Sequence, residues 1–211
     1  MEGLEPEPAA AVALFGDRIE LARAFTAALA EHGEERGLIG PLEVPRLWTR
    51  HILNSAIAAP LFPAGGVVGD VGSGAGLPGI VLAIARPDVR FVLIEPMERR
   101  VAWLEEQVAA LGLDNVVVER ARAEEAGRYE GTLDAVTARA VSALRTLIPW
   151  VAPLARDGGE LILLKGTGAP TEIEAAQKAI RKYKLSDVRV EVLGEGVLAE
   201  ETRVVRAVVR G

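Results

Sequence analysis

The residues best suited to chemistry lie in one run, Asp70-Val71-Gly72-Ser73-Gly74-Ala75-Gly76-Leu77-Pro78-Gly79. The apolar run Val67 to Val71 predicts a buried strand that leads into these glycines, and Ile80 to Ala85 predicts a helix directly after them. Because glycine has no Cβ, the backbone of such a turn and the helix N-terminus can lie against a nucleoside-type ligand. A glycine turn with a purely structural purpose is the alternative.

The spacing of the glycines separates two candidate cofactors. A dinucleotide loop has the pattern G-x-G-x-x-G, with its first glycine at the end of the strand. Gly72 ends the strand here, and Leu77 stands where the third glycine of that pattern is required. The alternate glycines Gly72, Gly74 and Gly76 after Asp70 instead follow the pattern of S-adenosylmethionine-dependent methyltransferases. Asp70 is also poorly placed for two phosphates and well placed for an ammonium group.

A second acid follows the next predicted strand. Val89 to Ile94 predicts a strand that leads to Glu95. In a sheet of this kind, an acid at this position accepts hydrogen bonds from the two ribose hydroxyls of a nucleoside. Glu95 can also complement the dipole of a helix that Pro96 opens, and the two roles are compatible. The glycine loop and this acid together favour a nucleoside cofactor, without separating NAD from S-adenosylmethionine.

Strand and helix patterns alternate from Val67 to the C-terminus. We expect strands at 67–71, 89–95, 116–119, 133–138, 160–165, 188–193 and 204–209, and helices at 80–85, 98–111, 144–154 and 172–184. This alternation predicts a parallel sheet with helices on both faces. Since no helix separates the last two strands, one of them runs antiparallel. Dehydrogenase domains do not usually end in such a pair, so the predicted fold is α/β: a Rossmann-like S-adenosylmethionine-dependent methyltransferase with a seven-stranded, mostly parallel sheet.

Two predicted helices precede the sheet and form an N-terminal helical cap. One begins near Asp17, with Asp17 and Glu20 spaced as in a capping box, and the other begins at Pro45. We therefore expect the cap at residues 1–62 and the Rossmann-like methyltransferase domain at residues 63–211.

The composition narrows the class of protein. The chain has 211 residues, 50% of them hydrophobic, no cysteine and a net charge of −6. It can bury one sizeable core, and it has no disulfide, thiolate zinc site or cysteine nucleophile. Its acidic, proline-bearing start is unlike a signal peptide, and no apolar run approaches the roughly 20 residues of a membrane span. We expect a cytoplasmic monomer without metal or membrane contact, in which RNA binding needs a local patch.

The chain also contains five distinctive motifs: Arg50-His51-Ile52-Leu53-Asn54-Ser55, the run from Asp70 to Gly79, Arg99-Arg100-Val101, Ala138-Arg139-Ala140 and Leu164-Lys165-Gly166. Together they resemble the bacterial small-subunit rRNA methyltransferase G family, also called glucose-inhibited division protein B. The resemblance runs from about Leu38 to the C-terminus. It implies methylation of guanine N7 in 16S rRNA near the decoding site, with S-adenosylmethionine as cofactor and the small ribosomal subunit as partner.

One segment departs from the pattern of this family. Many members carry Trp-Asn and then Asn-Leu-Thr before the second helix, where this chain has His32-Gly33 and Gly37-Leu38-Ile39. We therefore assign no role to the loop from Gly33 to Gly40.

The resemblance and the strand positions together indicate the cofactor-binding residues. Ala123 and Glu124 follow the third strand, where they can read the adenine edge or form a solvated acidic turn. Arg139 ends the fourth strand, where open sheets bind their ligands, and a surface arginine paired with an acid is the alternative. The full set is Gly72, Gly74, Gly76, Leu77, Glu95, Ala123, Glu124 and Arg139.

No residue is assigned as catalytic. Guanine N7 has a free lone pair, so its attack on the sulfonium methyl needs no base, and positioning in a desolvated pocket can supply most of the acceleration. Cytosine C5 methylation would need a cysteine. Exocyclic amine methylation usually uses an Asn- or Asp-Pro-Pro-aromatic motif after the fourth strand, where this chain has Thr137-Ala138-Arg139-Ala140. Two alternatives stay open: a small-molecule methyltransferase of the same fold, and a non-catalytic nucleotide- or NAD-binding module.

Other residues have less specific interpretations. His51 lies on an apolar helix face and is expected to be a packed, hydrogen-bonded histidine. Lys165 ends the fifth strand, where it faces RNA phosphate or caps the strand. The tryptophans, at helical spacing with apolar residues, are expected in the core: Trp48, Trp103 and Trp150. One helix carries the best local basic patch for RNA: Lys178, Arg181, Lys182 and Lys184.

Overall fold

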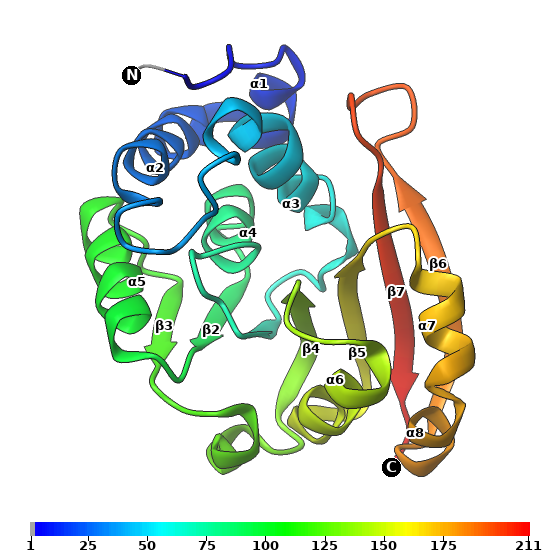
Figure 1. Cartoon of the computed structure of the whole chain (residues 1–211). Coiled ribbons are helices and arrows are strands. Elements are labelled where there is room, and N and C mark those ends of the chain that lie inside the picture. Colours follow the sequence, from blue (N-terminus) through cyan, green and yellow to red (C-terminus); the bar gives the residue numbers. More distant parts are fainter. Residues whose placement is uncertain (1–2) are drawn as a thin grey trace.

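Seven strands pair into one sheet that runs through the middle of the molecule (Figure 1). The computed structural model describes residues 3–211. The strand order is β3-β2-β1-β4-β5-β7-β6, and β7 runs antiparallel to both of its neighbours. The strands are β1 (Val67–Val71), β2 (Arg90–Ile94), β3 (Val116–Glu119), β4 (Leu133–Arg139), β5 (Ala155–Lys165), β6 (Leu185–Leu193) and β7 (Thr202–Val209). The predicted fold class, with one antiparallel strand, is confirmed.

The register of the parallel strands decides which loop residues meet. Val71 of β1 pairs with Ile94 of β2, and Asp70 pairs with Thr137 of β4. The residues that follow these strands therefore leave the sheet at one edge. This edge is the carboxyl edge, where open α/β sheets bind their ligands.

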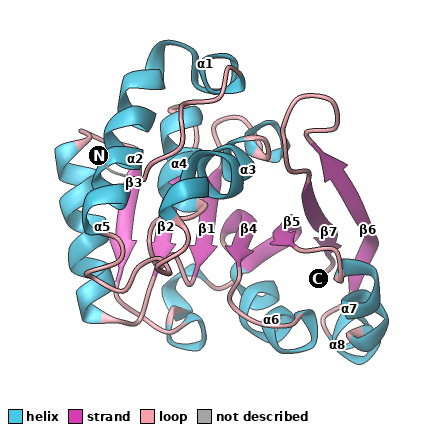
Figure 2. Ribbon diagram, turned by 45° about the horizontal axis from the view of Figure 1, so that its top comes forward, coloured by secondary structure: helices cyan, strands magenta, loops and turns pink. Residues whose placement is uncertain are grey.

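Helices cover the sheet on both faces, as Figure 2 shows. The first group is α1 (Ala10–Phe15), η1 (Gly16–Arg18), α2 (Ile19–His32), η2 (Val44–Arg46), η3 (Leu47–Leu53), α3 (Asn54–Ala56), η4 (Ala59–Leu61), α4 (Gly79–Ala85) and α5 (Glu98–Ala110). The second group is η5 (Ala123–Glu125), η6 (Gly127–Tyr129), α6 (Leu144–Val151), η7 (Ala152–Leu154), α7 (Ala169–Ala175) and α8 (Gln177–Lys182). Each face has its own cluster of buried apolar side chains. The alternating pattern of the sequence reflects this double covering.

The N-terminal helices complete the core on one face of the sheet. Phe25 of α2 and Ile52 of η3 are fully buried in the same apolar cluster as Leu93 of β2 and Trp103 of α5. Residues 3–62 thus form a layer that packs directly on the sheet and on α4 and α5. The boundary between residues 62 and 63 falls between η4 and β1, and the division into two domains stays a prediction.

Several element boundaries differ from those predicted. The capping box is wrong: Asp17 lies in the 3-10 turn η1, and the carboxylate of Glu20 pairs with Arg23 instead of capping α2. The helix α1 was not predicted. The single helix expected at 172–184 is two helices that meet at Ala176. Strand β5 begins at Ala155 rather than at residue 160, because its first residue continues the pairing with β4.

Among residues 3–211, no helix is both long and apolar enough to cross a membrane.

Candidate functional site

A cavity of about 310 Å³, which we call the β2 cavity, opens at the carboxyl edge of β1, β2 and β4. Five of the eight predicted cofactor-binding residues line it: Gly72, Glu95, Ala123, Glu124 and Arg139. They come from four separate stretches of the chain, and the parallel register brings those stretches together. Lining residues that were not predicted include Met97, Arg100, Arg122 and Trp150.

A second cavity of about 280 Å³, the loop cavity, lies on the other side of the glycine turn. Gly74 and Leu77 line it, and it shares Gly72 and Arg139 with the β2 cavity. Leu38, Ile39 and Gly40 form part of its wall. The N-terminal layer therefore contributes directly to the site, through the loop to which no role was assigned.

The three alternate glycines of the turn have different environments. All three adopt left-handed backbone, with φ of 72° at Gly72, 54° at Gly74 and 92° at Gly76. A Cβ on Gly74 would meet the carbonyl oxygen of Gly72 at 3.7 Å and Nη1 of Arg100 at 4.0 Å, both at ordinary contact distance, so nothing crowds this position at the loop cavity. A Cβ on Gly76 would lie 2.8 Å from a side-chain atom of Ile80. Gly76 lines neither cavity, and we interpret it as a packing residue beneath the turn.

Glu95 lies under the glycine turn and holds it. Its side chain is buried, and its two carboxylate oxygens accept hydrogen bonds from the backbone N–H groups of Gly74 and Met97, both at 2.9 Å. The role at the helix start is therefore present in the structure. Each carboxylate oxygen has a second lone pair, so the same group can still accept hydroxyl donors from the β2 cavity.

Asp70, like Glu95, accepts a backbone N–H beside the glycine turn. Its side chain has no exposed surface, and Oδ2 accepts the N–H of Gly79, at the start of α4, at 3.0 Å. A Cβ on Gly79 would lie 2.5 Å from this oxygen, so only glycine permits the approach. Oδ1 is buried and has no partner among the described residues. Burial raises the pKa of Asp70 to about 7.

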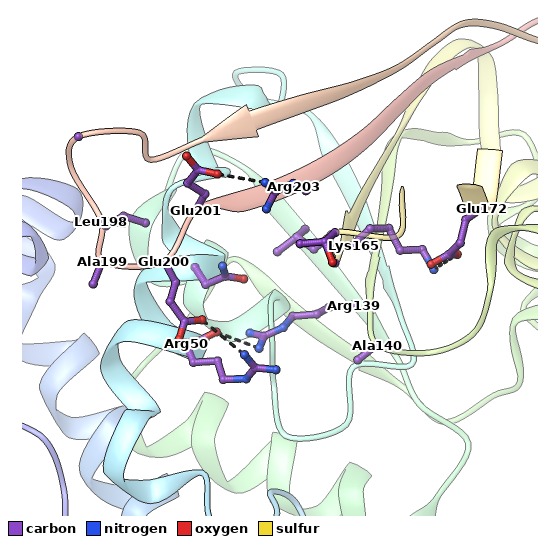
Figure 3. A pocket seen from close by; sticks show the side chains of 15 residues that line it. Arg50, Arg139, Ala140, Lys165, Glu172, Leu198, Ala199, Glu200, Glu201 and Arg203 are labelled. Atoms are coloured by element: carbon purple, nitrogen blue, oxygen red, sulfur yellow. Dashed lines mark hydrogen bonds and ion pairs between the residues drawn. The ribbon is translucent and has the colours of Figure 1, made fainter. Parts of the chain in front are cut away.

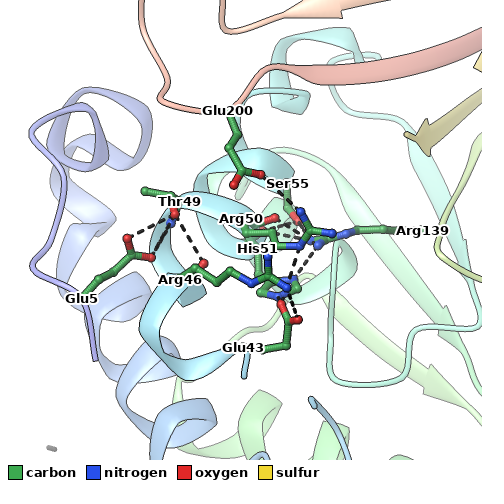
Figure 4. A network of polar contacts seen from close by, with 9 residues as sticks. All are labelled: Glu5, Glu43, Arg46, Thr49, Arg50, His51, Ser55, Arg139 and Glu200. Carbon is green, nitrogen blue, oxygen red and sulfur yellow. Dashed lines mark hydrogen bonds and ion pairs between the residues drawn. The ribbon is translucent and has the colours of Figure 1, made fainter. Parts of the chain in front are cut away.

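Arg139 extends from the end of β4 into the N-terminal layer (Figure 4). Nη1 donates to the carbonyl of His51 and to Oγ of Ser55, both at 3.1 Å. Nη2 donates to the carbonyl of Arg50 at 3.1 Å and to the ring Nδ1 of His51. Burial lowers the pKa of Arg139 to about 10. The guanidinium is thus held by a helical segment, and neither sequence interpretation of Arg139 anticipated these partners.

The contact with Arg139 determines the protonation of His51. Because Nη2 of Arg139 can only donate, Nδ1 of His51 must accept, and the ring proton lies on Nε2. Nε2 donates to Glu43, which also pairs with Arg46 at 2.6 Å. Burial, followed by the charge of Arg139, lowers the pKa of His51. The prediction of a packed, hydrogen-bonded histidine is confirmed.

The segment that accepts these bonds has an unusual local structure. Leu47–Leu53 forms a π-helix, whose wider turns are rare and frequent at functional sites. The N-terminal chain holds it as well, since Glu5 accepts hydrogen bonds from the backbone N–H and the hydroxyl of Thr49. We infer that the π-helix presents its carbonyls to β4.

A third and larger cavity of about 840 Å³, the β5 cavity, adjoins the other two (Figure 3). Arg139 and Ala140 line all three cavities, so the cavities meet at the end of β4. Ala140 has a φ of 54°, a conformation that residues with a side chain rarely adopt and that clusters at functional sites.

Three of the four cations that line the β5 cavity are paired with glutamates, and the fourth is Arg139. Lys165 contacts Glu172 at 2.8 Å and donates to the carbonyl of Ser142. Arg50 contacts Glu200 at 3.4 Å, and Arg203 contacts Glu201 at 3.2 Å. Glu200 and Glu201 belong to the loop between β6 and β7. Any anion that enters this cavity must therefore compete with carboxylates of the protein itself.

The other expectations have mixed outcomes. Trp48 and Trp103 are buried, and the indole N–H of Trp103 donates to the carbonyl of Ala75 in the glycine turn at 3.0 Å. Trp150 is partly buried: it packs against the core cluster, as predicted, and it also borders the β2 cavity, which was not predicted. Residues that line a cavity and residues that pack in the core recur at the same helical spacing, so the sequence pattern cannot distinguish them.

The predicted basic patch lies away from the cavities. Its residues are exposed and belong to α8 and the turn before β6. Since β6 runs parallel to β5, its first residues lie at the amino edge of the sheet, opposite the carboxyl edge. The patch and the cavities therefore occupy opposite edges.

The hydrogen bonds of Arg139 predict a large contribution to stability. Arg139→Ala removes four hydrogen bonds from a charged donor, of about 1.5–3 kcal/mol each, although the carbonyl of His51 keeps the hydroxyl of Ser55 as a donor. We expect the free energy of unfolding in urea to fall by about 2–5 kcal/mol. Arg122→Ala is the matched control, because Arg122 is an exposed arginine that lines the same β2 cavity. Equal losses for the two variants would contradict this role.

The raised pKa of Asp70 predicts a pH-dependent stability. The folded state keeps the proton up to about pH 7, whereas the unfolded chain releases it near the ordinary aspartate pKa of 3.8. Folding therefore binds a proton in this interval, and Asp70 lowers the free energy of unfolding as the pH rises from about 4 to 7, by up to about 1.4 kcal/mol per pH unit. Urea unfolding of the wild type and of Asp70→Asn at several pH values measures the difference. A difference that does not change over this interval would show that Asp70 is ionised throughout.

Comparison with known proteins identifies the family of this chain. A family model described as rRNA small subunit methyltransferase G matches residues 18–203. The chain is 68% identical to the ribosomal RNA small subunit methyltransferase G of Leifsonia xyli subsp. xyli, over 99% of each chain. It is 67% identical to the protein of the same name from Clavibacter michiganensis subsp. michiganensis, over 97% of this chain and 96% of the relative. The similarity thus begins well before Leu38, where the resemblance was expected to start.

Solved structures support the fold at lower identity. A SAM-dependent O-methyltransferase from Thermotoga maritima superposes with a TM-score of 0.58 at 18% identity, over 81% of this chain and 71% of that one. A tRNA (m1A58) methyltransferase from Aquifex aeolicus gives a TM-score of 0.59 at 15% identity, over 75% and 68%. Fold and relatives together confirm the predicted methyltransferase class and its S-adenosylmethionine cofactor. The chain belongs to the rRNA small subunit methyltransferase G family.

Proposed function

We propose that this methyltransferase transfers the methyl group of S-adenosylmethionine to N7 of a guanine in 16S rRNA, near the decoding site of the small subunit. The observation that carries the proposal is the meeting of three cavities at Arg139 and Ala140. The β2 and loop cavities suit the two ends of the cofactor, and the β5 cavity is the larger space beside them. Action in the cytoplasm as a monomer stays a prediction.

The residues present fit the cofactor. Gly74 lines the loop cavity, where a side chain would take space from a ligand, and Glu95 has acceptor capacity left for ribose hydroxyls. We assign the nucleoside to the β2 cavity, with Glu95 at the ribose and Ala123 and Glu124 at the adenine. The amino-acid end then lies in the loop cavity, against Gly74 and Leu77.

Methyl transfer to guanine N7 needs little from the protein beyond the correct placement of the cofactor and the base. The cofactor supplies a sulfonium-bound methyl group, which is open to in-line attack by a nucleophile with a lone pair. Guanine N7 carries no proton, so no side chain has to remove one. The N-terminal layer and the glycine turn hold the cofactor in place, and the buried ends of β1 and β4 exclude water on their side. No general base is needed among the cavity residues.

The β5 cavity is the proposed entrance for the target base. Sequence-specific RNA recognition usually takes unpaired bases, which fold out of a loop into a pocket. Arg50, Lys165 and Arg203 line this cavity, while the protein as a whole is acidic. We propose that RNA phosphates replace the glutamates as partners of these cations. The predicted basic patch on α8 and the turn before β6 lies at the opposite edge of the sheet, too far away to hold the same nucleotide.

Methyl transfer tests the proposal directly. Purified protein and S-adenosylmethionine are incubated with small ribosomal subunits, with naked 16S rRNA and with free guanosine, each prepared without the modification. Mass spectrometry of nuclease fragments should find one N7-methylguanosine, near the decoding site. Transfer to a small metabolite, with none to either RNA substrate, would overturn the rRNA proposal and favour the small-molecule alternative. The comparison of the two RNA substrates identifies which one the enzyme accepts.

Gly74 tests the cofactor position. Gly74→Val places a branched side chain at the loop cavity, at a φ that favours glycine, so we expect loss of S-adenosylhomocysteine binding in calorimetry. Gly112→Val is the matched control, since Gly112 has a φ of 60° and open space but follows α5 outside the cavities. Both variants should stay folded by circular dichroism. Unchanged affinity in a folded Gly74→Val variant would overturn the cofactor position.

Glu95 tests the ribose contact. Loss of a charged hydrogen bond costs about 1.5–3 kcal/mol, so Glu95→Ala should weaken S-adenosylhomocysteine binding by roughly ten-fold or more. Glu98→Ala, an exposed acid in the first turn of the same helix α5, should leave binding unchanged. An effect of Glu95→Ala no greater than that of Glu98→Ala would limit Glu95 to its place at the helix start.

A further inference from the structure

Arg100 is a cation without a hydrogen-bond partner at the boundary of the β2 and loop cavities. It lies in the first turns of α5 and lines both cavities. Its side chain is about one-third exposed, yet its Nε is buried and has no partner among the described residues. The nearest acid is Glu95, at 4.0 Å, and that carboxylate already accepts two backbone N–H groups. A buried donor left without a partner is costly, and its presence at a cavity points to a ligand.

The other cationic groups of the loop cavity are already engaged. Both terminal nitrogens of Arg139 donate to the π-helix and its side chains. His51 is neutral, because its Nδ1 accepts from Arg139. Within the described part of the chain, Arg100 is therefore the cation of this cavity whose donors are free. Its Nη1 would lie 4.0 Å from a Cβ on Gly74, which lines the same cavity.

We propose that Arg100 binds the α-carboxylate of the amino-acid end of S-adenosylmethionine. This inference rests on the cofactor placement of the proposed function. The carboxylate is the one anionic group of the cofactor, since the sulfonium and the ammonium are both cationic. A guanidinium matches a carboxylate in two parallel hydrogen bonds, which are short and strong. Arg100 would then hold the amino-acid end while Glu95, in contact with the same turn, holds the ribose.

The choice of ligand separates this role from a structural one. Calorimetry compares S-adenosylhomocysteine with its decarboxylated analogue and with 5′-methylthioadenosine, which lacks the whole amino-acid end. Arg100→Met should weaken binding of S-adenosylhomocysteine by about ten-fold or more, and binding of the other two ligands by less than about two-fold. Arg100→Lys should restore part of the loss, because it keeps the charge without the planar fork. Arg99→Met is the matched control, an exposed arginine one position earlier in the helix.

The outcomes that overturn the proposal are distinct. Equal weakening of all three ligands by Arg100→Met would mean that Arg100 acts only through Glu95 or the fold, and thermal melting of the ligand-free variant detects the latter. Unchanged ligand affinity with weakened rRNA binding would assign Arg100 to an RNA phosphate instead. Failure of the wild type to bind S-adenosylhomocysteine would overturn the cofactor placement itself, and so is distinguishable from failure of Arg100 alone.

Discussion

The contact between the Arg139 guanidinium and the π-helix is the interaction on which the site depends. It joins the end of β4 to the N-terminal layer, because one guanidinium donates to two backbone carbonyls of the π-helix at the same time. The three cavities meet at this point, so the same contact fixes where the end of β4 lies between them. A buried guanidinium is costly to desolvate, and the four acceptors around it offset that cost.

The glycine turn depends on a second set of buried polar contacts. Asp70 and Glu95 each accept a backbone N–H from the turn or from the helix after it, and Trp103 donates to the turn from α5. Three different elements thus hold a stretch that has few side chains of its own. Such a turn is rigid before the cofactor arrives, which reduces the entropy lost on binding. The raised pKa of Asp70 indicates what this arrangement costs in stability near neutral pH.

The electrostatics of the β5 cavity, the proposed entrance for the target base, differ from those of a typical RNA-binding surface. The protein is acidic, and its carboxyl-edge cations Arg50, Lys165 and Arg203 are paired with glutamates. Pairing of this kind keeps the cations in place while it weakens diffuse attraction to phosphate. Under the proposed function, it favours RNA contacts that form only when the target loop is correctly seated.

Local sequence was sufficient for the fold class and for most of the predicted residues that meet at the β2 and loop cavities, whose role in cofactor binding stays a prediction. Strand and helix periodicity, the spacing of Gly72, Gly74 and Leu77, and the acid Glu95 depend on near neighbours, and parallel pairing places strand ends at one edge whatever the details. Only the tertiary structure decided that Gly76 packs inward, that Trp150 borders a cavity, and that Arg139 bonds to a π-helix some 90 residues earlier. The tertiary structure also places the guanidinium of Arg100 at the boundary of two cavities, with its buried Nε without a hydrogen-bond partner among the described residues. The partner of a long polar side chain is set by contacts between distant segments, and no local pattern encodes those contacts.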